Sequence, residues 1–95
     1  MFFVYIIKSN SIDRFYIGYT SESIEERISK HNSSFYSNGY TSKADDWTLF
    51  YSIECTSAPQ ALKIEKHIKK MKSRKYIENL IKYPEITIKL LARYS

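Results

Sequence analysis

Apolar residues in the first twenty positions follow the pattern of a β-hairpin. Residues 2–8 are dense in Val, Ile, Phe and Tyr, the residue types that strands favour. The sequence Ser-Asn-Ser-Ile-Asp at 9–13 is turn-prone, and residues 15–20 return to the strand composition. Two such runs joined by a short polar segment predict two antiparallel strands.

A helix is predicted after the hairpin. Ser21 is placed to cap its N-terminus, and three glutamates follow in its first turns, where the positive end of the helix dipole favours them. Ile24 and Ile28 are spaced i, i+4 and therefore face the core together. We expect this helix to end near Asn32.

The middle of the chain predicts a long loop and a third strand. Residues 33–46 are polar and show no period, and a loop of this length often carries function. Residues 47–55 alternate between apolar and polar types. This period of two predicts a strand with four residues on one face: Leu49, Tyr51, Ile53 and Cys55.

Two helices are predicted in the last third of the chain. Ser57 can cap a helix that carries a proline in its first turn and runs to about residue 72. Ser73 can cap a third helix over residues 74–82, which the pair Tyr83-Pro84 stops. The pattern of residues 85–95 does not predict one kind of element, and a strand is one option.

This order of elements predicts an α+β fold, with a three-stranded antiparallel-type sheet made of the hairpin plus one strand and with helices packed on it. A chain of 95 residues with 43% hydrophobic residues fits one compact domain and excludes a two-domain enzyme or a disordered polymer. We place the domain at residues 1–83 and a tail of uncertain structure at 84–95.

The cysteine content and the length of the apolar runs limit the cellular environments that this chain fits. Cys55 is the only cysteine, so no intramolecular disulfide forms, and with His31 and His67 it cannot complete a four-ligand zinc cage. The apolar start lacks the basic region and cleavage site of a signal peptide, and the longest apolar run is too short to span a membrane. We expect a soluble, cytoplasmic protein.

Positive charge is concentrated late in the chain. The whole chain has a net charge of +5, residues 1–60 hold five basic and seven acidic side chains, and residues 61–95 hold ten and three. Seven of the basic residues lie within 63–75. A nucleic acid, an anionic membrane surface and a merely solvated helix face all fit this charge.

Three residues of the hairpin have a chemical as well as a structural interpretation. Tyr5 and Tyr16 lie near the middle of their strands, and Tyr16 shares its face with Gly18. Because a glycine inside a strand often marks the close approach of a ligand or another backbone, this region resembles the floor of a site. The alternative is that the two tyrosines simply pack across the strands.

The predicted helices carry three further candidates. Arg27 and His31 are four residues apart, so their side chains share one helix face and can converge on a small anion, although surface groups at this spacing are common. Glu65 falls inside the apolar arc of its helix. A carboxylate in that position needs a cation, which is either a lysine or arginine or a metal ion such as magnesium.

Together these residues resemble the GIY-YIG nuclease superfamily. The pattern is Phe3-Val4-Tyr5, ten intervening residues, Tyr16-Ile17-Gly18, and then Arg27, His31 and a helical Glu65. It is most similar to the small single-domain bacterial members that begin with a Val-Tyr-Ile strand. The resemblance covers about residues 3–82. Phe3 and Val4 stand where the family name has Gly and Ile, but Tyr5 is present.

The resemblance implies an endonuclease that hydrolyses DNA phosphodiester bonds by in-line attack of water, with a role in DNA repair or recombination. Glu65 would carry a single Mg²⁺ or Mn²⁺ ion. Tyr5 and Tyr16 would orient or deprotonate the water, Arg27 would hold the scissile phosphate, and His31 would assist by hydrogen bonding or proton transfer. No small-molecule cofactor is implied. Three positions match family supporting groups less specifically: Gly18, Tyr40 and Asn79. Thr41 and Lys43 are further options beside Tyr40.

DNA would be bound mainly through its backbone phosphates. The predicted contacts are the basic residues of the loop and of the two late helices: Lys43, Lys63, Lys66, Lys69, Lys70, Lys72, Arg74 and Lys75. The protein would either act on DNA structure or damage, or depend on a homodimer or a targeting partner protein for specificity, and no membrane is involved. The alternatives are a non-catalytic nucleic-acid-binding module that uses residues 63–75 and a protein-interaction domain.

Overall fold

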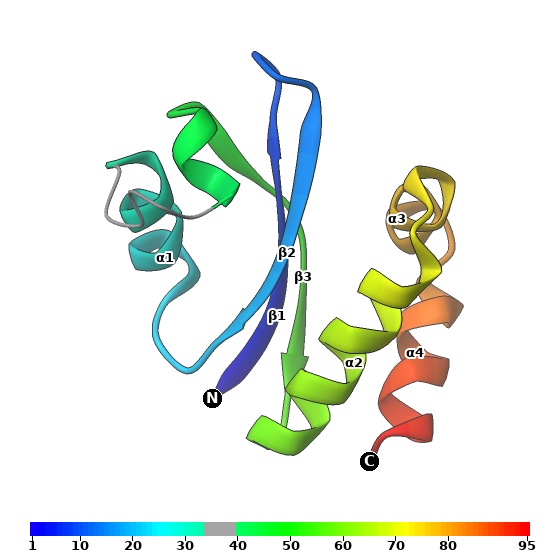
Figure 1. Cartoon of the computed structure of the whole chain (residues 1–95). Coiled ribbons are helices and arrows are strands. Elements are labelled where there is room, and N and C mark those ends of the chain that lie inside the picture. Colours follow the sequence, from blue (N-terminus) through cyan, green and yellow to red (C-terminus); the bar gives the residue numbers. More distant parts are fainter. Residues whose placement is uncertain (34–39) are drawn as a thin grey trace.

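The computed structural model describes residues 1–33 and 40–95, without the side chains of Tyr40 and Ser42. It contains three strands, four α-helices and one 3-10 helix (Figure 1). In chain order these elements are β1 (Phe2–Ser9), β2 (Arg14–Thr20), α1 (Ile24–Asn32), η1 (Tyr40–Lys43), β3 (Trp47–Cys55), α2 (Ala58–Met71), α3 (Arg74–Lys82) and α4 (Pro84–Arg93).

The sheet is antiparallel throughout and has the strand order β2-β1-β3. Helices cover both of its faces, with α1 and η1 on one side and α2 to α4 on the other (Figure 1). The central strand β1 is therefore buried on both faces from Val4 to Ile7, which explains its nearly continuous apolar sequence. The predicted α+β fold with a hairpin and one further strand is confirmed.

The sheet separates two apolar clusters. The larger lies between the sheet and α2 to α4 and includes Val4, Ile6, Ile64 and Leu80. The smaller lies under α1 and is built on Tyr5, Ile7 and Trp47, with Tyr16, Ile24 and Ile28 packed against it. The two candidate tyrosines of the hairpin therefore belong to the α1 side of the molecule.

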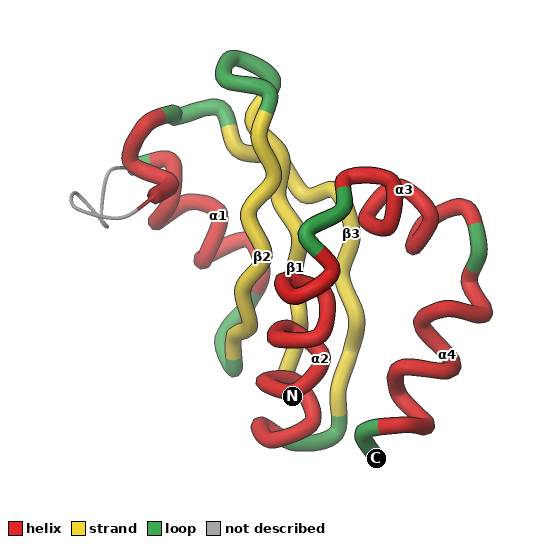
Figure 2. Tube along the Cα trace, turned by 45° about the vertical axis from the view of Figure 1, so that its right-hand side comes forward, coloured by secondary structure: helices red, strands yellow, loops and turns green. Residues whose placement is uncertain are grey.

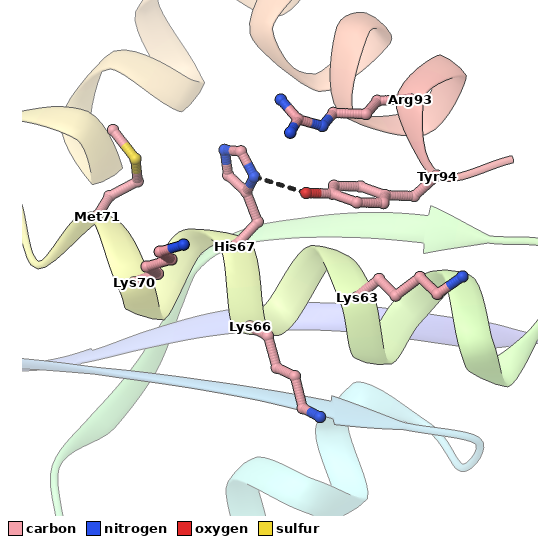
Figure 3. A pocket seen from close by; sticks show the side chains of 7 residues that line it. All are labelled: Lys63, Lys66, His67, Lys70, Met71, Arg93 and Tyr94. Atoms are coloured by element: carbon pink, nitrogen blue, oxygen red, sulfur yellow. Dashed lines mark hydrogen bonds between the residues drawn. The ribbon is translucent and has the colours of Figure 1, made fainter.

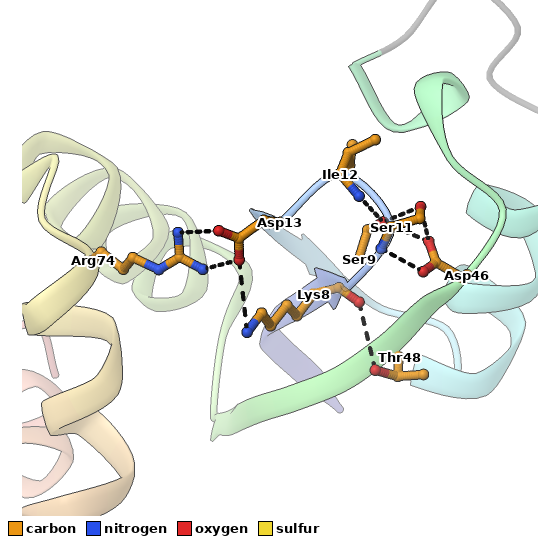
Figure 4. Close-up of polar contacts among 8 residues, drawn as sticks. All are labelled: Lys8, Ser9, Ser11, Ile12, Asp13, Asp46, Thr48 and Arg74. Atoms are coloured by element: carbon orange, nitrogen blue, oxygen red, sulfur yellow. Dashed lines mark hydrogen bonds and ion pairs between the residues drawn. The ribbon is translucent and has the colours of Figure 1, made fainter.

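Two carboxylates anchor the turn between β1 and β2 (Figure 4). Asp13, at φ 52°, accepts two hydrogen bonds from the Arg74 guanidinium at the start of α3, at 2.5 and 3.3 Å. Asp46, just before β3, accepts from the hydroxyls of Ser9 and Ser11 and from the Ser11 backbone N–H. The turn is thus tied to both layers. Arg74, a predicted DNA contact, is engaged in this ion pair.

The first helix begins two residues later than predicted. Ser23, and not Ser21, is the N-cap, and its hydroxyl accepts from the Glu26 backbone N–H at 3.1 Å. The Thr20 hydroxyl accepts the Glu22 N–H at 3.0 Å and closes a local turn before the helix. This turn uses the residues that the sequence pattern assigned to the helix start. The end at Asn32 agrees with the prediction.

A register shift in β3 corrects the predicted alternation of that strand. Ile7 pairs with Leu49 whereas Ile6 pairs with Tyr51, so one extra residue of β3 lies between them. Such a bulge moves the following residues to the opposite face. Leu49 is therefore on the α1 side and 48% exposed. Tyr51, Ile53 and Cys55 are on the α2 side as a group.

The caps of the two late helices agree with the sequence pattern. Ser57 and Ser73 each accept a backbone N–H three residues ahead, from Gln60 and Tyr76 respectively. Lys72 ends α2 in the left-handed region at φ 47°. Within the predicted loop of residues 33–46, the described part forms the short helix η1.

Residues 84–93 form α4, so a strand in the tail was the wrong option. Pro84 stops α3 and also occupies the first turn of α4, where its missing N–H costs nothing. The helix returns along α2 (Figure 2) and buries Leu90 against the larger cluster. No helix in the described part of the chain is both long and apolar enough to cross a membrane.

Candidate active site

Tyr5 lies at the centre of the candidate site. Its side chain is fully buried on the α1 face of the central strand, opposite Gly18 of β2. A Cβ atom on Gly18 would lie 2.6 Å from the Tyr5 hydroxyl and 2.7 Å from its Cζ. Residue 18 must therefore lack a side chain for Tyr5 to adopt this position. The group that approaches the glycine closely is a side chain of the protein itself, and not the ligand that the sequence pattern suggested.

Two side chains of α1 converge on the Tyr5 hydroxyl. The Nε2 atom of His31 lies 3.0 Å from it, and the Arg27 Nη2 atom donates a hydrogen bond to it at 3.4 Å. Arg27 also lies over the Tyr5 ring, 5.9 Å from its centroid. The i, i+4 spacing on one helix face thus brings a guanidinium and an imidazole to one phenol.

Tyr16 completes this group from β2. Its ring centroid is 5.0 Å from that of His31 and 6.4 Å from that of Tyr5. Tyr16 is only partly buried, whereas Tyr5 and His31 are almost inaccessible. Tyr16 therefore forms the outer edge of the aromatic group, where a substrate would arrive.

His31 is held as a neutral imidazole. Burial, together with the positive charge of Arg27, lowers the pKa of His31 to about 4. Its Nδ1 atom lies 2.6 Å from the Thr41 hydroxyl, while Nε2 faces Tyr5. A neutral imidazole has one N–H donor and one acceptor nitrogen. His31 can therefore accept a hydrogen bond from Tyr5 while donating one to Thr41, or do the reverse.

Thr41 is a positioning residue whose contact the sequence could not indicate. It lies in η1, is 2% exposed, and its carbonyl accepts the Trp47 Nε1–H at 2.9 Å. Asn32 in turn bonds the Trp47 backbone N–H and C=O at 2.7 and 2.9 Å. This chain of bonds holds the end of α1, η1 and the start of β3 together around the imidazole. The family resemblance offered Thr41 as one of three options in this loop, but its sequence did not indicate the bond to His31.

Glu65 borders the site from the other layer. It is buried on α2, and its Oε2 atom forms an ion pair with Lys69 Nζ at 3.2 Å. A basic side chain, one of the two kinds of cation that the sequence predicted for this carboxylate, lies beside it. Lys69 Nζ also lies 5.9 Å from the centre of the Tyr16 ring. The Glu65–Lys69 pair therefore reaches Tyr16 around the edge strand β2.

Comparison with known families gives one match. The model of the GIY-YIG catalytic domain matches residues 1–77, which include every one of the side chains described above. The chain belongs to the GIY-YIG family. This is a family of nucleases, which hydrolyse phosphodiester bonds. Neither a curated protein nor a solved structure matches the chain significantly.

A polar cleft opens beside Arg27 in this GIY-YIG domain. It has a volume of about 410 Å³, and six residues line it: Tyr19, Thr20, Ser21, Glu22, Arg27 and Lys30. Glu22 accepts a hydrogen bond from Lys30 at 3.0 Å and lies 3.7 Å from Arg27 Nη1. The Lys30 ammonium keeps the pKa of Glu22 below its usual value. Neither Glu22 nor Lys30 was singled out as a site residue from the sequence.

Apart from Gly18, the supporting positions of the family pattern lie on α3 and η1. Asn79 lies on α3, in the layer on the far side of the sheet from α1 (Figure 1). Its carbonyl accepts the Tyr83 N–H at 2.8 Å and so ends the helix. Lys43 is exposed at the end of η1. The side chain of Tyr40 lies outside the described part of the chain.

Glu65 is the only buried carboxylate in the described part of the chain. GIY-YIG nucleases generally use divalent metals. Among residues 1–33 and 40–95, no three His, Cys, Asp or Glu side chains gather into a metal-binding group. A single carboxylate fits a hard cation such as Mg²⁺, which keeps several waters and takes further oxygens from a substrate phosphate.

Proposed function

We propose that this protein is a metal-dependent DNA endonuclease with Tyr5, Tyr16, Arg27, His31 and Glu65 in its active site. The observation that carries the proposal is the convergence of His31 Nε2 and Arg27 Nη2 on the buried Tyr5 hydroxyl in a domain of a nuclease family. A phenol between a neutral imidazole and a guanidinium is placed to exchange a proton.

Arg27 is the residue that would bind the scissile phosphate. Its side chain is 26% exposed and lines the polar cleft beside Tyr5. The planar guanidinium presents parallel N–H donors to two phosphate oxygens and stabilises the negative charge that develops during attack. Glu22 and Tyr5 hold it in place, at 3.7 and 3.4 Å, so little ordering is needed when DNA binds.

Tyr5 would remove the proton from the attacking water. An ordinary phenol loses its proton only near pH ~10, so a base role needs a positive charge close by that favours the phenolate. The charge of Arg27 supplies it, and His31 Nε2 orients the phenol by a hydrogen bond while its other nitrogen bonds Thr41. Tyr16, at the exposed edge, would orient the water.

Glu65 would hold the divalent cation, Mg²⁺ or Mn²⁺. The Lys69 ammonium occupies the carboxylate at 3.2 Å, and its long side chain, half exposed, can turn away into solvent when a metal binds. A cation bound there would acidify water and stabilise the leaving oxygen. With one protein carboxylate, binding should be weak until phosphate oxygens complete the coordination.

The proposal is tested by cleavage of supercoiled plasmid and of branched and single-stranded DNA with Mg²⁺, Mn²⁺ or a chelator. We expect wild-type protein to cut in the presence of metal and Glu65→Gln to lose at least ~100-fold in rate while binding DNA normally. The matched control is Glu78→Gln, an exposed carboxylate of α3, which should cut like the wild type. A fully active Glu65→Gln protein would disprove the metal assignment.

The Glu65–Lys69 ion pair also favours a second candidate, a nucleic-acid-binding module without catalysis. A carboxylate already neutralised by its own helix neighbour has no need of a metal. Such a module would bind DNA equally well with magnesium and with a chelator, and it would cut none of the three substrates. The same assay therefore separates the two functions.

A further inference from the structure

A second cleft lies on the opposite flank of α2 from Glu65 and Lys69. It has a volume of about 570 Å³ and is lined by residues of α2 and of the C-terminal end of the chain: Lys63, Lys66, His67, Lys70, Met71, Arg93 and Tyr94. His67, Arg93 and Tyr94 face one another between the two helices (Figure 3). The family match ends at residue 77, so α4 adds this wall to the GIY-YIG domain.

The positive charge of this α2–α4 cleft is not neutralised by carboxylates. Lys63, Lys66, Lys70 and Arg93 make no ion pair with any of the described residues, and no acidic side chain lines the cleft. The basic residues nearer β2 differ, since Lys69 pairs with Glu65 and Arg74 with Asp13. Cations gathered in this way repel one another, and an anion between them relieves the repulsion.

His67 responds to this positive potential. Its pKa is lowered, first by burial and then by the charges of Arg93 and Lys70. The ring stays in place because its Nδ1 atom is bonded to the Tyr94 hydroxyl at 2.9 Å. Arg93 in turn lies over the Tyr94 ring at 5.5 Å. The cleft thus presents a fixed aromatic wall between cations.

A phosphodiester backbone fits this surface better than a membrane does. Basic side chains with an aromatic ring between them are typical of nucleic-acid contacts, where cations bind phosphates and the ring stacks on a base or sugar. Binding to a lipid surface requires an exposed apolar face beside the cations. Met71 is the only aliphatic side chain among the lining residues.

We propose that the α2–α4 cleft binds the backbone of a nucleic-acid segment away from the scissile phosphate. This inference rests on the proposed function and names a second contact region of the same substrate. A helix with its side chains is ~10–12 Å wide, so the cleft and Glu65 are separate places on α2. Lys66 points away from α4 (Figure 3) and connects the two flanks. The substrate is therefore long enough to cross α2.

The test is equilibrium binding of a fluorescein-labelled 30-base-pair duplex, and of a single strand of equal length, in chelator and over a series of salt concentrations. Lys63→Gln/Arg93→Gln removes two charges from the cleft. Arg14→Gln/Lys82→Gln removes two exposed charges from β2 and α3, neither of them among the predicted DNA contacts, and is the matched control. We expect the cleft variant to bind about tenfold more weakly, with a salt slope smaller by about 2 because two phosphate contacts are lost.

The control should stay within about twofold of the wild type, and Lys63→Arg, which keeps the charge, should bind normally. An unchanged affinity of the cleft variant would overturn the proposal. A control that loses as much affinity as the cleft variant would also overturn it, because binding would then follow net charge. Loss of binding to phosphatidylglycerol vesicles, with DNA binding unchanged, would assign the cleft to a membrane. Because the chelator prevents cutting, this binding assay tests the cleft independently of cleavage. The cleft proposal can therefore be disproved while the plasmid assay still shows cutting, and cutting can be absent while the cleft still binds DNA.

Discussion

At the residue scale, the Tyr5 hydroxyl is the point where three elements of the α1 side meet. β1 carries the phenol, α1 carries Arg27 and His31, and η1 supplies Thr41 behind the imidazole. Each contact needs the others, because a buried phenol or imidazole without a partner would destabilise the fold. The arrangement is therefore maintained by folding itself, before any substrate binds.

Gly18→Ala is expected to damage this arrangement. A Cβ atom 2.6 Å from the Tyr5 hydroxyl forces the ring to move, and the buried ring cannot move without breaking its bond to His31. We expect a loss of about 1–3 kcal/mol in the free energy of unfolding and a large loss of cleavage rate, measured by urea unfolding and by the plasmid assay.

The control for this prediction is Tyr5→Leu combined with Gly18→Ala. Leucine has no atom at the position of Cζ, so the double variant should be more stable than the sum of the two single changes predicts, while remaining inactive. Strict additivity of the two changes would show that Gly18 is not kept small by Tyr5.

The pKa of His31 makes stability depend on pH in a defined window. The unfolded chain takes up this proton near pH ~6.5, and the folded chain near about 4. Between those values unfolding binds a proton, so the free energy of unfolding falls as the pH is lowered, by at most about 1.4 kcal/mol per pH unit. Urea midpoints from pH 7 to 4 measure this fall.

His31→Asn removes the titrating group, so its stability relative to the wild type should improve steadily from pH 6.5 to 4. His67→Asn is the control. Because it leaves His31 in place, its free energy of unfolding should still decrease between pH 6.5 and 4 through the titration of His31. Parallel curves for wild type and His31→Asn would contradict the assignment of a buried, neutral imidazole.

At the element scale, α4 packs against the same apolar cluster as α2 and α3. It buries Leu90, which is 4% exposed, and it forms one wall of the α2–α4 cleft. A division of the chain at residue 83 would separate a helix from the core that it covers.

Leu90→Ala should therefore lower the free energy of unfolding by about 2–5 kcal/mol, since it leaves a cavity in the larger cluster. Ile88 lies on the same helix and is 65% exposed, and Ile88→Ala should change stability by no more than about 0.5 kcal/mol. Urea unfolding of both variants is the measurement. Equal effects would mean that α4 does not pack as a stable element.

At the scale of the whole molecule, the candidate site spans both layers of helices. Tyr5, Arg27 and His31 lie on the α1 side of the sheet, and Glu65 and Lys69 come from α2 on the other side (Figure 1). β2 is an edge strand, so the two sets of side chains can meet around it. Tyr16, on that strand, is the link between them.

Lys69→Met should change the metal requirement of cleavage. The Lys69 ammonium and a divalent cation compete for the same Glu65 carboxylate, so its removal should lower the magnesium concentration for half-maximal rate several-fold. Lys82→Met, at an exposed lysine without an ion pair among the described residues, is the control. A magnesium titration unchanged by Lys69→Met would show that the ion pair does not occupy the metal position.

Much of the architecture could be predicted from local patterns. The strands, the capped helices α2 and α3, and the shared face of Arg27 and His31 depend on residues within about four positions of each other, whose side-chain and backbone preferences are present in any short segment. The resemblance to the family was carried by the order and spacing of six residues, which the sequence gives directly: Tyr5, Tyr16, Gly18, Arg27, His31 and Glu65.

Only the tertiary structure decided what these residues touch. The bulge in β3 moved Leu49 to the other face, α4 formed where no pattern was decisive, and Lys69 lies beside the Glu65 carboxylate. The bond between His31 and Thr41 depends on how η1 packs against α1. Contacts between segments distant in sequence arise from packing of the whole chain, and packing is not encoded in the period of any one segment.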